Sequence, residues 1–475
     1  MKRINIISLI IILCATTAIA VEVAIDKDKM LKVDGNRTFI LGLYSPRIDD
    51  FEELTLLKKA GFNLVSAPVD ESKIAKIAES GLWVWVNIHS AVGSDDPQKR
   101  DSDLRNLIEK IKLQPNFLVW EMPDEALWNI YLRNFEAKRF EEPKLIMEKI
   151  GNLSDQKLKG DIEAKLNIAV NFYSKGLWEE GEKVVQEIWQ ILGETSPYAN
   201  YSMARIEEHK NKELEKLQHA YKLLNELDYK HPVWMNHAPR NSMESLRKFS
   251  QTADIIGCDI YPVPMHPKLR HSDLMDQTMA CVGAYTRRMQ AIDPQKPVWM
   301  VIQGFNWGSL QGDIYERSGD EQKGFRPPTL SEIRFMGFDC IVNGARGILF
   351  WGTHYVDRNS QLWKDLLTFA SEINRFKHVL AEEDANEGLK IKCDEIYGSG
   401  DRGIITLIKL HNGKPYTFIV NEWHECGIRY YISSPHFHPG MKLKEFYSGA
   451  ELSLSSNVLS YGIENFGVQV WTPVD

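Results

Sequence analysis

Residues 63–90 read NLVSAPVDESKIAKIAESGLWVWVNIHS: a short apolar run, a mixed polar and apolar segment, and a second short apolar run. The two apolar runs, Leu64–Ala67 and Trp83–Ile88, have the length and composition of buried β-strands. Between them, Ser72–Ser80 repeats its apolar residues with helical spacing. A strand, a helix and a second strand in this order predict two parallel strands covered by a helix.

The same unit recurs along most of the chain. The other expected strands are Phe39–Tyr44, Phe117–Met122, Val233–Asn236, Ile255–Tyr261, Val298–Ile302 and Gly347–Trp351. The other expected helices are Phe51–Ala60, Asp103–Ile111, Ser242–Phe249, Met275–Ile292, Ser331–Asn343 and Leu362–Phe376. Eight strands alternating with helices predict an α/β protein with a (β/α)₈ barrel. A doubly wound open sheet is the alternative, but that fold usually carries a glycine-rich phosphate loop after its first strand, and residues 42–46 are not one.

Three further segments complete the expected organisation. Residues 1–20 combine a basic start, an apolar stretch and a small-residue cleavage site, which predicts a signal peptide and a periplasmic or extracellular location. The barrel is expected over residues 21–380, interrupted by a helical insertion at about 127–227. This insertion could shape the cleft, bind a protein partner or only cover apolar surface. From Ile391 onward the apolar period changes to two, which predicts an all-β domain over residues 381–475, with a sandwich as the expected form. Its expected strands are Ile404–Leu410, Tyr416–Val420, Ile428–Ile432, Leu443–Phe446 and Val468–Trp471.

Composition excludes several classes of protein. The formal net charge of −8 argues against nucleic-acid binding, which usually needs a basic face. No stretch after residue 20 is long and apolar enough to span a membrane. Without Cys14 the cysteines form an odd, scattered set, so we expect buried thiols rather than a disulfide framework. No cluster has metal-ligand spacing, and no cofactor is expected.

In such a barrel the catalytic groups lie at the carboxyl ends of the strands. The polar and aromatic residues expected there are Tyr44, His89, Glu125, Asn236, His237, Asp259, Tyr261, Gln303 and Trp351. Aromatic faces stack on sugar rings, so this set suits a carbohydrate.

The fourth strand ends in Glu121-Met122-Pro123-Asp124-Glu125. This resembles the Glu-x-x-Asn-Glu ending of the same strand in clan A glycoside hydrolases, with Asp124 in place of the Asn. The resemblance extends over roughly residues 30–380 through further short motifs in the same order. These motifs are Val33-Asp34-Gly35, Gly42-Leu43-Tyr44, Asn87-Ile88-His89, Asp259-Ile260-Tyr261-Pro262 and Gly344–Ile348 before Trp351. It implies a glycoside hydrolase acting on an oligo- or polysaccharide, with Glu125 as general acid/base.

The residues themselves are compatible with that role for Glu125. A general acid must keep its proton near neutral pH. Asp124 is a like-charged neighbour, and Trp120 and Trp128 supply apolar surroundings; both effects raise a carboxyl pKa. The alternative is that Asp124 and Glu125 only begin a helix, where acidic residues suit the helix dipole.

The sequence offers more than one candidate for the second catalytic carboxylate. The family places a nucleophilic Glu at the end of strand seven, where this chain has Gln303, and an amide cannot form a glycosyl ester. Asp259 is the first candidate to replace it and Glu121 the second. An inverting arrangement with a more distant acid is a further option, and a barrel that binds sugar without cleaving it is the alternative function.

The remaining residues are expected to contact substrate. Asp124, by the resemblance, contacts a sugar hydroxyl near the reacting carbon, and Trp351 is the expected sugar platform. The other expected contacts are His89, Tyr44, Asn236, His237, Tyr261 and Gln303. An enzyme of another class on the same barrel stays open, because one fold hosts many chemistries.

Overall fold

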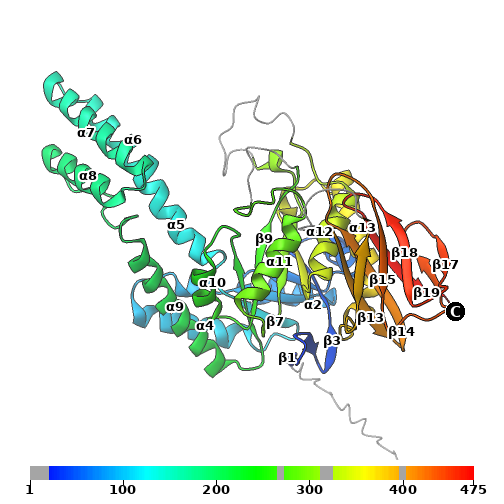
Figure 1. Cartoon of the computed structure of the whole chain (residues 1–475). Helices are drawn as coiled ribbons and strands as arrows, with labels where there is room; N and C mark the ends of the chain where they lie inside the picture. Colours follow the sequence, from blue (N-terminus) through cyan, green and yellow to red (C-terminus); the bar gives the residue numbers. More distant parts are fainter. Residues whose placement is uncertain (1–20, 265–271, 311–324, 395–402, 475) are drawn as a thin grey trace, which may run out of the picture.

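The computed structural model describes residues 21–264, 272–310, 325–394 and 403–474 (Figure 1). The expected signal peptide lies outside these residues. Within the described ranges, no helix is both long enough and apolar enough to cross a membrane.

Eight parallel strands close into a barrel, which confirms the expected fold class. The strands are β4 (Ile40–Leu43), β5 (Leu64–Ala67), β6 (Trp83–Asn87), β7 (Phe117–Glu121), β8 (Val233–His237), β9 (Ile255–Ile260), β10 (Trp299–Gln303) and β11 (Gly347–Trp351). Each expected strand is present, and its ends lie within one residue of the prediction. Strands covered on both faces consist of short apolar runs, which is why the pattern locates them well.

Alternation along β9 decides which of its side chains face the barrel interior. Ile256, Cys258 and Ile260 belong to the apolar layer between the strands and the outer helices. Ile255 belongs to the interior cluster, and a Cβ on Gly257 would lie 1.6 Å from the carbonyl oxygen of Trp299. Because residues two apart share a face, Asp259 also points into the barrel, at its carboxyl end.

Helices cover the outside of the barrel (Figure 1). They are α1 (Phe51–Ala60), α2 (Glu71–Glu79), α3 (His89–Val92), α4 (Pro97–Ile111), α9 (Ile206–Leu227), α10 (Met243–Ser250), α11 (Cys281–Ile292), α12 (Leu330–Val342) and α13 (Gln361–Leu380). Helix α11 was expected from Met275. It begins six residues later because the Asp276 side chain accepts hydrogen bonds from the Thr278 N–H and hydroxyl, which form a turn instead.

A small antiparallel sheet precedes the barrel: β1 (Val23–Ile25), β2 (Leu31–Val33) and β3 (Asn36–Thr38). The turn between β2 and β3 contains Asp34 and Gly35, both with positive φ. Val23 and Leu31 belong to the same apolar cluster as the barrel interior, so this sheet adds to the barrel core.

The insertion after β7 forms an arm that projects from the barrel (Figure 1). It consists of α5 (Ala126–Glu136), a π-helical segment (Ala137–Glu141), α6 (Glu142–Gly151), α7 (Gln156–Ser174) and α8 (Trp178–Leu192). Helices α6 to α8 share a separate apolar core that includes Ile162, Tyr173 and Trp189. The arm therefore has packing of its own, and α9 returns the chain to the barrel.

The last part of the chain forms two antiparallel sheets, as expected for a sandwich. One sheet contains β12 (Lys390–Cys393), β15 (Ile428–Ser433) and β18 (Val458–Ile463). The other contains β13 (Ile404–His411), β14 (Lys414–Asn421), β19 (Val468–Pro473), β16 (Lys442–Glu445) and β17 (Glu451–Ser453). We call these eight strands the β domain. Strands β12, β17 and β18 were not predicted; the all-exposed β12 and the three-residue β17 offer little apolar alternation.

Strand β14, in the five-stranded sheet, is buried on both faces. On β14, Phe418 and Val420 join the core with the barrel helices, whereas Ile419 joins the core between the two sheets. Phe418 stacks on Phe338 of α12 with ring centroids 6.1 Å apart. The β domain is thus packed against the barrel by apolar contacts along α12 and α13.

The close approach at Gly257 predicts a strong effect of adding one methyl group. Gly257→Ala would drive a Cβ into the Trp299 carbonyl and should destabilise the protein by about 3 kcal/mol or more. Gly160→Ala on α7 is the control: no atom lies within 4 Å of its Cβ position, and alanine should stabilise the helix by up to about 1 kcal/mol. Thermal unfolding compares the two, and equal melting temperatures would contradict this packing.

Candidate active site

Glu125 lies where the chain turns from β7 into α5. It caps the N-terminus of α5 with φ 47° and ψ 34°, a left-handed conformation that is unusual for a residue with a side chain. Such a conformation costs about 1–3 kcal/mol and persists where its surroundings hold it. The Glu125 N–H donates to the Asn236 carbonyl at 3.2 Å, which ties this turn to β8.

The Glu125 side chain lies close to Asp259 from β9, two strands away, and the two carboxyl groups affect each other's pKa. Burial, followed by the charges of Asp259 and Asp124, raises the pKa of Glu125 well above its ordinary value. Burial also raises the pKa of Asp259 to about 7, against the opposing effect of hydrogen bonds that include those from Glu125 and Tyr261. Burial and the negative charges around the pair therefore favour a state in which the two carboxyl groups carry one proton between them.

Asp124 lies beside the pair and is held by β8. The Asn236 amide donates to Asp124 Oδ1 at 2.8 Å. Burial raises the pKa of Asp124, while the Asn236 side chain, the Glu125 N–H and the charge of His89 lower it. Asn236 Oδ1 and Asp259 Oδ1 are buried and have no hydrogen-bond partner among the described residues.

Glu121 lies deeper and is occupied by other side chains. One of its oxygens accepts from the Tyr44 hydroxyl at 2.9 Å, and the other from Trp85 Nε1 at 3.0 Å and Asn87 Nδ2 at 2.9 Å. Burial and the charge of Asp124 raise its pKa to about 8, although these donors favour the charged form. Because both oxygens of Glu121 are already bonded, whereas Asp259 Oδ1 has no partner among the described residues, the geometry favours Asp259 over Glu121 as the partner of Glu125.

Aromatic rings form one wall of this region. Tyr261 stacks on Trp351 with centroids 5.4 Å apart and planes inclined by 19°. Phe305 and Trp307 pack edge-on against Tyr261, and Trp307 Nε1 donates to its carbonyl at 3.2 Å. Trp351, the expected sugar platform, ends β11 and is partly exposed. It lies against Tyr261, which neighbours Asp259.

Gln303 and His237 are placed differently from the expectation. Gln303 is fully buried, and its amide bonds three backbone groups: Val263 N–H at 2.9 Å, Val263 C=O at 2.6 Å and Phe305 C=O at 3.0 Å. It holds the loops after β9 and β10 together and has no surface for a sugar. His237 is 1% exposed, and its Nε2 lies 3.0 Å from Ser250 Oγ, on the side of the outer helices.

A cleft of 510 Å³ opens beside Glu125. It is lined by Asn87, His89, Pro123, Asp124, Glu125, Ala126, Asn129, Ile130, Arg133 and Glu213. His89 is exposed at this cleft, as a substrate-contacting residue must be. Asn87 was named in the sequence only as part of the Asn87-Ile88-His89 motif, and Asn129 and Arg133 carried no sequence signal.

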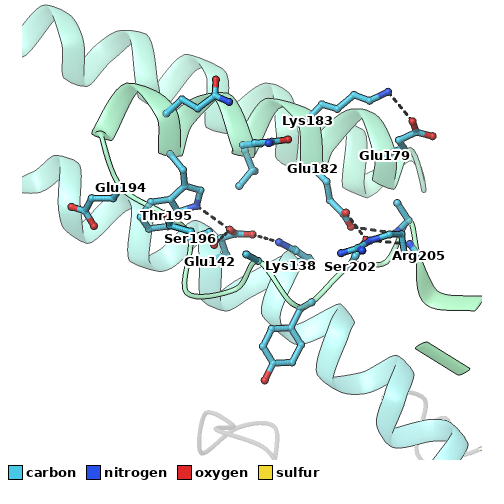
Figure 2. A pocket seen from close by; sticks show the side chains of 17 residues that line it. Lys138, Glu142, Glu179, Glu182, Lys183, Glu194, Thr195, Ser196, Ser202 and Arg205 are labelled. Atoms are coloured by element: carbon cyan, nitrogen blue, oxygen red, sulfur yellow. Dashed lines mark hydrogen bonds and ion pairs between the residues drawn. The ribbon is translucent and has the colours of Figure 1, made fainter. Parts of the chain in front are cut away.

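A second cavity, of 650 Å³, lies in the arm between α8 and residues 194–205 (Figure 2). Its buried Glu142 accepts from Lys138 Nζ at 2.8 Å, from Trp189 Nε1 at 2.9 Å and from Ser196. Glu182 accepts from the Ser202 hydroxyl at 2.6 Å and from the next two backbone N–H groups. These carboxylates attach the segment before α9 to the arm, so the cavity's acids have a structural role.

Within the described ranges, no group of three or more His, Cys, Asp or Glu side chains could hold a metal ion. The five cysteines that follow residue 20 are unpaired; Cys258, Cys281 and Cys340 are buried, Cys426 is partly buried and Cys393 is exposed.

The bonding of Gln303 leads to a stability prediction. Gln303→Ala removes the partners of three buried backbone groups and should lower the free energy of unfolding by about 3 kcal/mol or more. Gln98→Ala, an exposed change at the start of α4, is the control and should have little effect. Chemical denaturation measures both, and a Gln303→Ala protein as stable as the control would show that the amide does not hold these loops.

The sequence matches no protein-family model and no curated protein. Several solved structures superpose on most of the chain. One is a beta-galactosidase from Bacillus circulans sp. alkalophilus, which has 10% identity and a TM-score of 0.49; the match covers 92% of this chain and 99% of that one. A GH42 beta-galactosidase from G. stearothermophilus has 10% identity, a TM-score of 0.48, and coverage of 92% and 98%. A GH30 endoxylanase from Clostridium papyrosolvens has 8% identity, a TM-score of 0.45, and coverage of 96% and 100%. Similarity of this degree carries no inference about activity, which depends on the site.

Proposed function

We propose that this protein is a glycoside hydrolase that cleaves an oligo- or polysaccharide, with Glu125 as general acid/base and Asp259 as its partner. The observation that carries the proposal is that these two buried carboxyl groups lie close enough at the mouth of the barrel to affect each other's pKa. Glycosidic cleavage needs one protonated and one ionised carboxyl beside the scissile bond. Here the two pKa values differ in the required order, because the proton is held more strongly by Glu125 than by Asp259.

The close contact of the two carboxyl groups favours a retaining mechanism. Retaining enzymes place their carboxyls about 5–5.5 Å apart, whereas inverting enzymes separate them by about 6.5–9.5 Å to admit water. Asp259 would attack the anomeric carbon while Glu125 gives its proton to the departing glycosidic oxygen. Water would then give a proton to Glu125 and attack the anomeric carbon, which releases Asp259. Asp259 thus takes the place of the strand-seven Glu that the resemblance implied.

The surroundings of the pair suit a sugar. The partly exposed Trp351 offers aromatic surface for a pyranose ring, and Asn236 Oδ1 and Asp259 Oδ1 are unsatisfied acceptors for hydroxyl groups. The cleft beside Glu125 adds the polar side chains of Asn87, His89 and Asn129.

A barrel that binds carbohydrate without cleaving it is the second candidate. One observation favours it: Gln303 stands where the resemblance places the nucleophile, and its amide is fully engaged by backbone groups. The same aromatic and polar surroundings would bind a glycan in both cases. The two functions differ only in whether the carboxyl pair reacts.

Glu125→Gln separates the two candidates. The amide cannot donate the acid's proton, so kcat on unactivated glycosides should fall on the order of 10³-fold while glycan binding persists. The control is Glu136→Gln, an exposed change on the same helix that should leave kcat unchanged. Equal turnover by wild type and Glu125→Gln on every cleaved glycan would refute the assigned acid. Absence of turnover by the wild type, with intact glycan binding, would favour the binding barrel.

The pKa order predicts the pH profile of kcat/KM. Activity should rise as pH increases through about 7, where Asp259 loses its proton, and fall at higher pH, where Glu125 loses its own. Initial rates on a cleaved glycoside between acidic and alkaline pH measure this curve. A maximum in the acidic range would contradict the raised pKa of Asp259.

The role of Asp259 can be tested by chemical rescue. Asp259→Ala should be inactive but regain turnover of an activated glycoside with azide, because the small anion occupies the space of the lost carboxylate. The azide attacks the anomeric carbon and the aglycone leaves, so the product should be a glycosyl azide with the anomeric configuration opposite to the substrate. Wild type should release a sugar with the configuration retained. NMR of the first product distinguishes the outcomes, and an inverted wild-type product would exclude Asp259 as nucleophile.

A further inference from the structure

Two buried acids meet where the β domain packs on the barrel. Asp339 belongs to α12 and has no exposed surface, and Glu422 directly follows β14 and is 2% exposed. Their carboxyl groups lie together, since the Asn343 amide donates to an oxygen of each, and this proximity allows a hydrogen bond between the two acids. Such a bond between two acids requires that one of them carries a proton.

Neighbouring groups hold this pair in place. Asn343 Nδ2 donates to Asp339 Oδ1 at 2.9 Å and to Glu422 Oε1 at 3.3 Å, and the Gly283 N–H donates to Asp339 Oδ2 at 2.7 Å. The residue at 283 must be small, because a Cβ there would lie 2.6 Å from both Asp339 Oδ1 and Glu422 Oε1. The site is therefore built around the contact of the two acids.

The charges around the pair do not balance when both acids are ionised. Arg287 of α11 donates to Glu422 Oε1 at 2.8 Å and is the cation that acts on the pair. The Cys340 thiol of α12 is the other titratable neighbour; it is buried, and the charge of Asp339 contributes to its raised pKa. One guanidinium can neutralise one carboxylate, and the residues that the structure describes place no second cation against the pair, so a second negative charge would be buried with hydrogen-bond donors but without a counter-charge.

We propose that a proton shared by Asp339 and Glu422 fastens the β domain to the barrel, and that this fastening weakens as pH rises. In the closed state Asp339 holds the proton and donates to the Glu422 carboxylate. When the β domain separates from α12, Asp339 meets water and ionises as an ordinary aspartic acid does. Opening thus releases one proton, and higher pH favours it.

The sign and size of the effect follow from proton linkage. Burial, together with Glu422, raises the pKa of Asp339 well above its ordinary value in the closed state. Between the ordinary and the raised pKa, the equilibrium constant for opening rises about tenfold per pH unit. Below the ordinary pKa, Asp339 is protonated in both states, so the equilibrium constant for opening does not change with pH through this group. Above the raised pKa, Asp339 is ionised in both states and the pH dependence ends.

Hydrogen exchange on the full chain tests the proposal. Protection factors of amides in α12 and β14, corrected for intrinsic exchange, should fall in the wild type by up to about tenfold per pH unit as pH rises above the ordinary pKa of an aspartic acid, about 4. Asp339→Asn should remove this slope, because its amide can donate to Glu422 and accept from Gly283 at every pH. Asp365→Asn, a buried acid on α13 that is bonded to Gln361 of its own helix, is the control and should keep the slope.

A second variant covers the case in which Asp339→Asn does not fold. Glu422→Gln should also remove the slope, since its amide can donate to Asp339 without a proton from solvent. The proposal is overturned if the wild type shows no slope at the α12–β14 boundary, or if either folded variant keeps a slope equal to that of the wild type.

Discussion

The contact between Glu125 and Asp259 is the constraint on which the chemistry of this protein depends. Two carboxyl groups from different strands are held close enough to be hydrogen-bonded, in a region that is mostly buried. The contact requires β7 to end in a left-handed turn at Glu125, tied by its N–H to β8. It also requires the alternation of β9, which directs Asp259 into the barrel. The parallel barrel thus converts two separate acids into one unit with a single proton.

The barrel could be read from the sequence because its strands are short apolar runs between amphipathic helices. Every strand from β4 to β11 lies where that pattern placed it. The pattern failed where a side chain overrides it, as at Asp276, whose hydrogen bonds to Thr278 delay the start of α11. It also failed for β12, because that strand is exposed along its whole length and has no apolar face to reveal it.

Part of the candidate site could also be predicted, because strand ends are the positions at which barrels carry function. The roles of individual residues were harder to foresee. Gln303 ends its strand as the resemblance requires, but its amide is saturated by loops from β9 and β10, a fact of tertiary packing. Asn236 and His237 are consecutive residues of β8 and point to opposite faces. Asn236 holds Asp124, whereas His237 faces the outer helices. Sequence spacing alone does not show which side chains meet across a barrel mouth.

Neutron diffraction from crystals at neutral pH would test the central contact most directly, because it locates the hydrogen nucleus that the pair shares. The account predicts one deuterium between the side chains, bonded to Glu125 and directed at an oxygen of Asp259. Two bare carboxylates turned away from each other, or a deuterium fixed on Asp259 with Glu125 ionised, would contradict it.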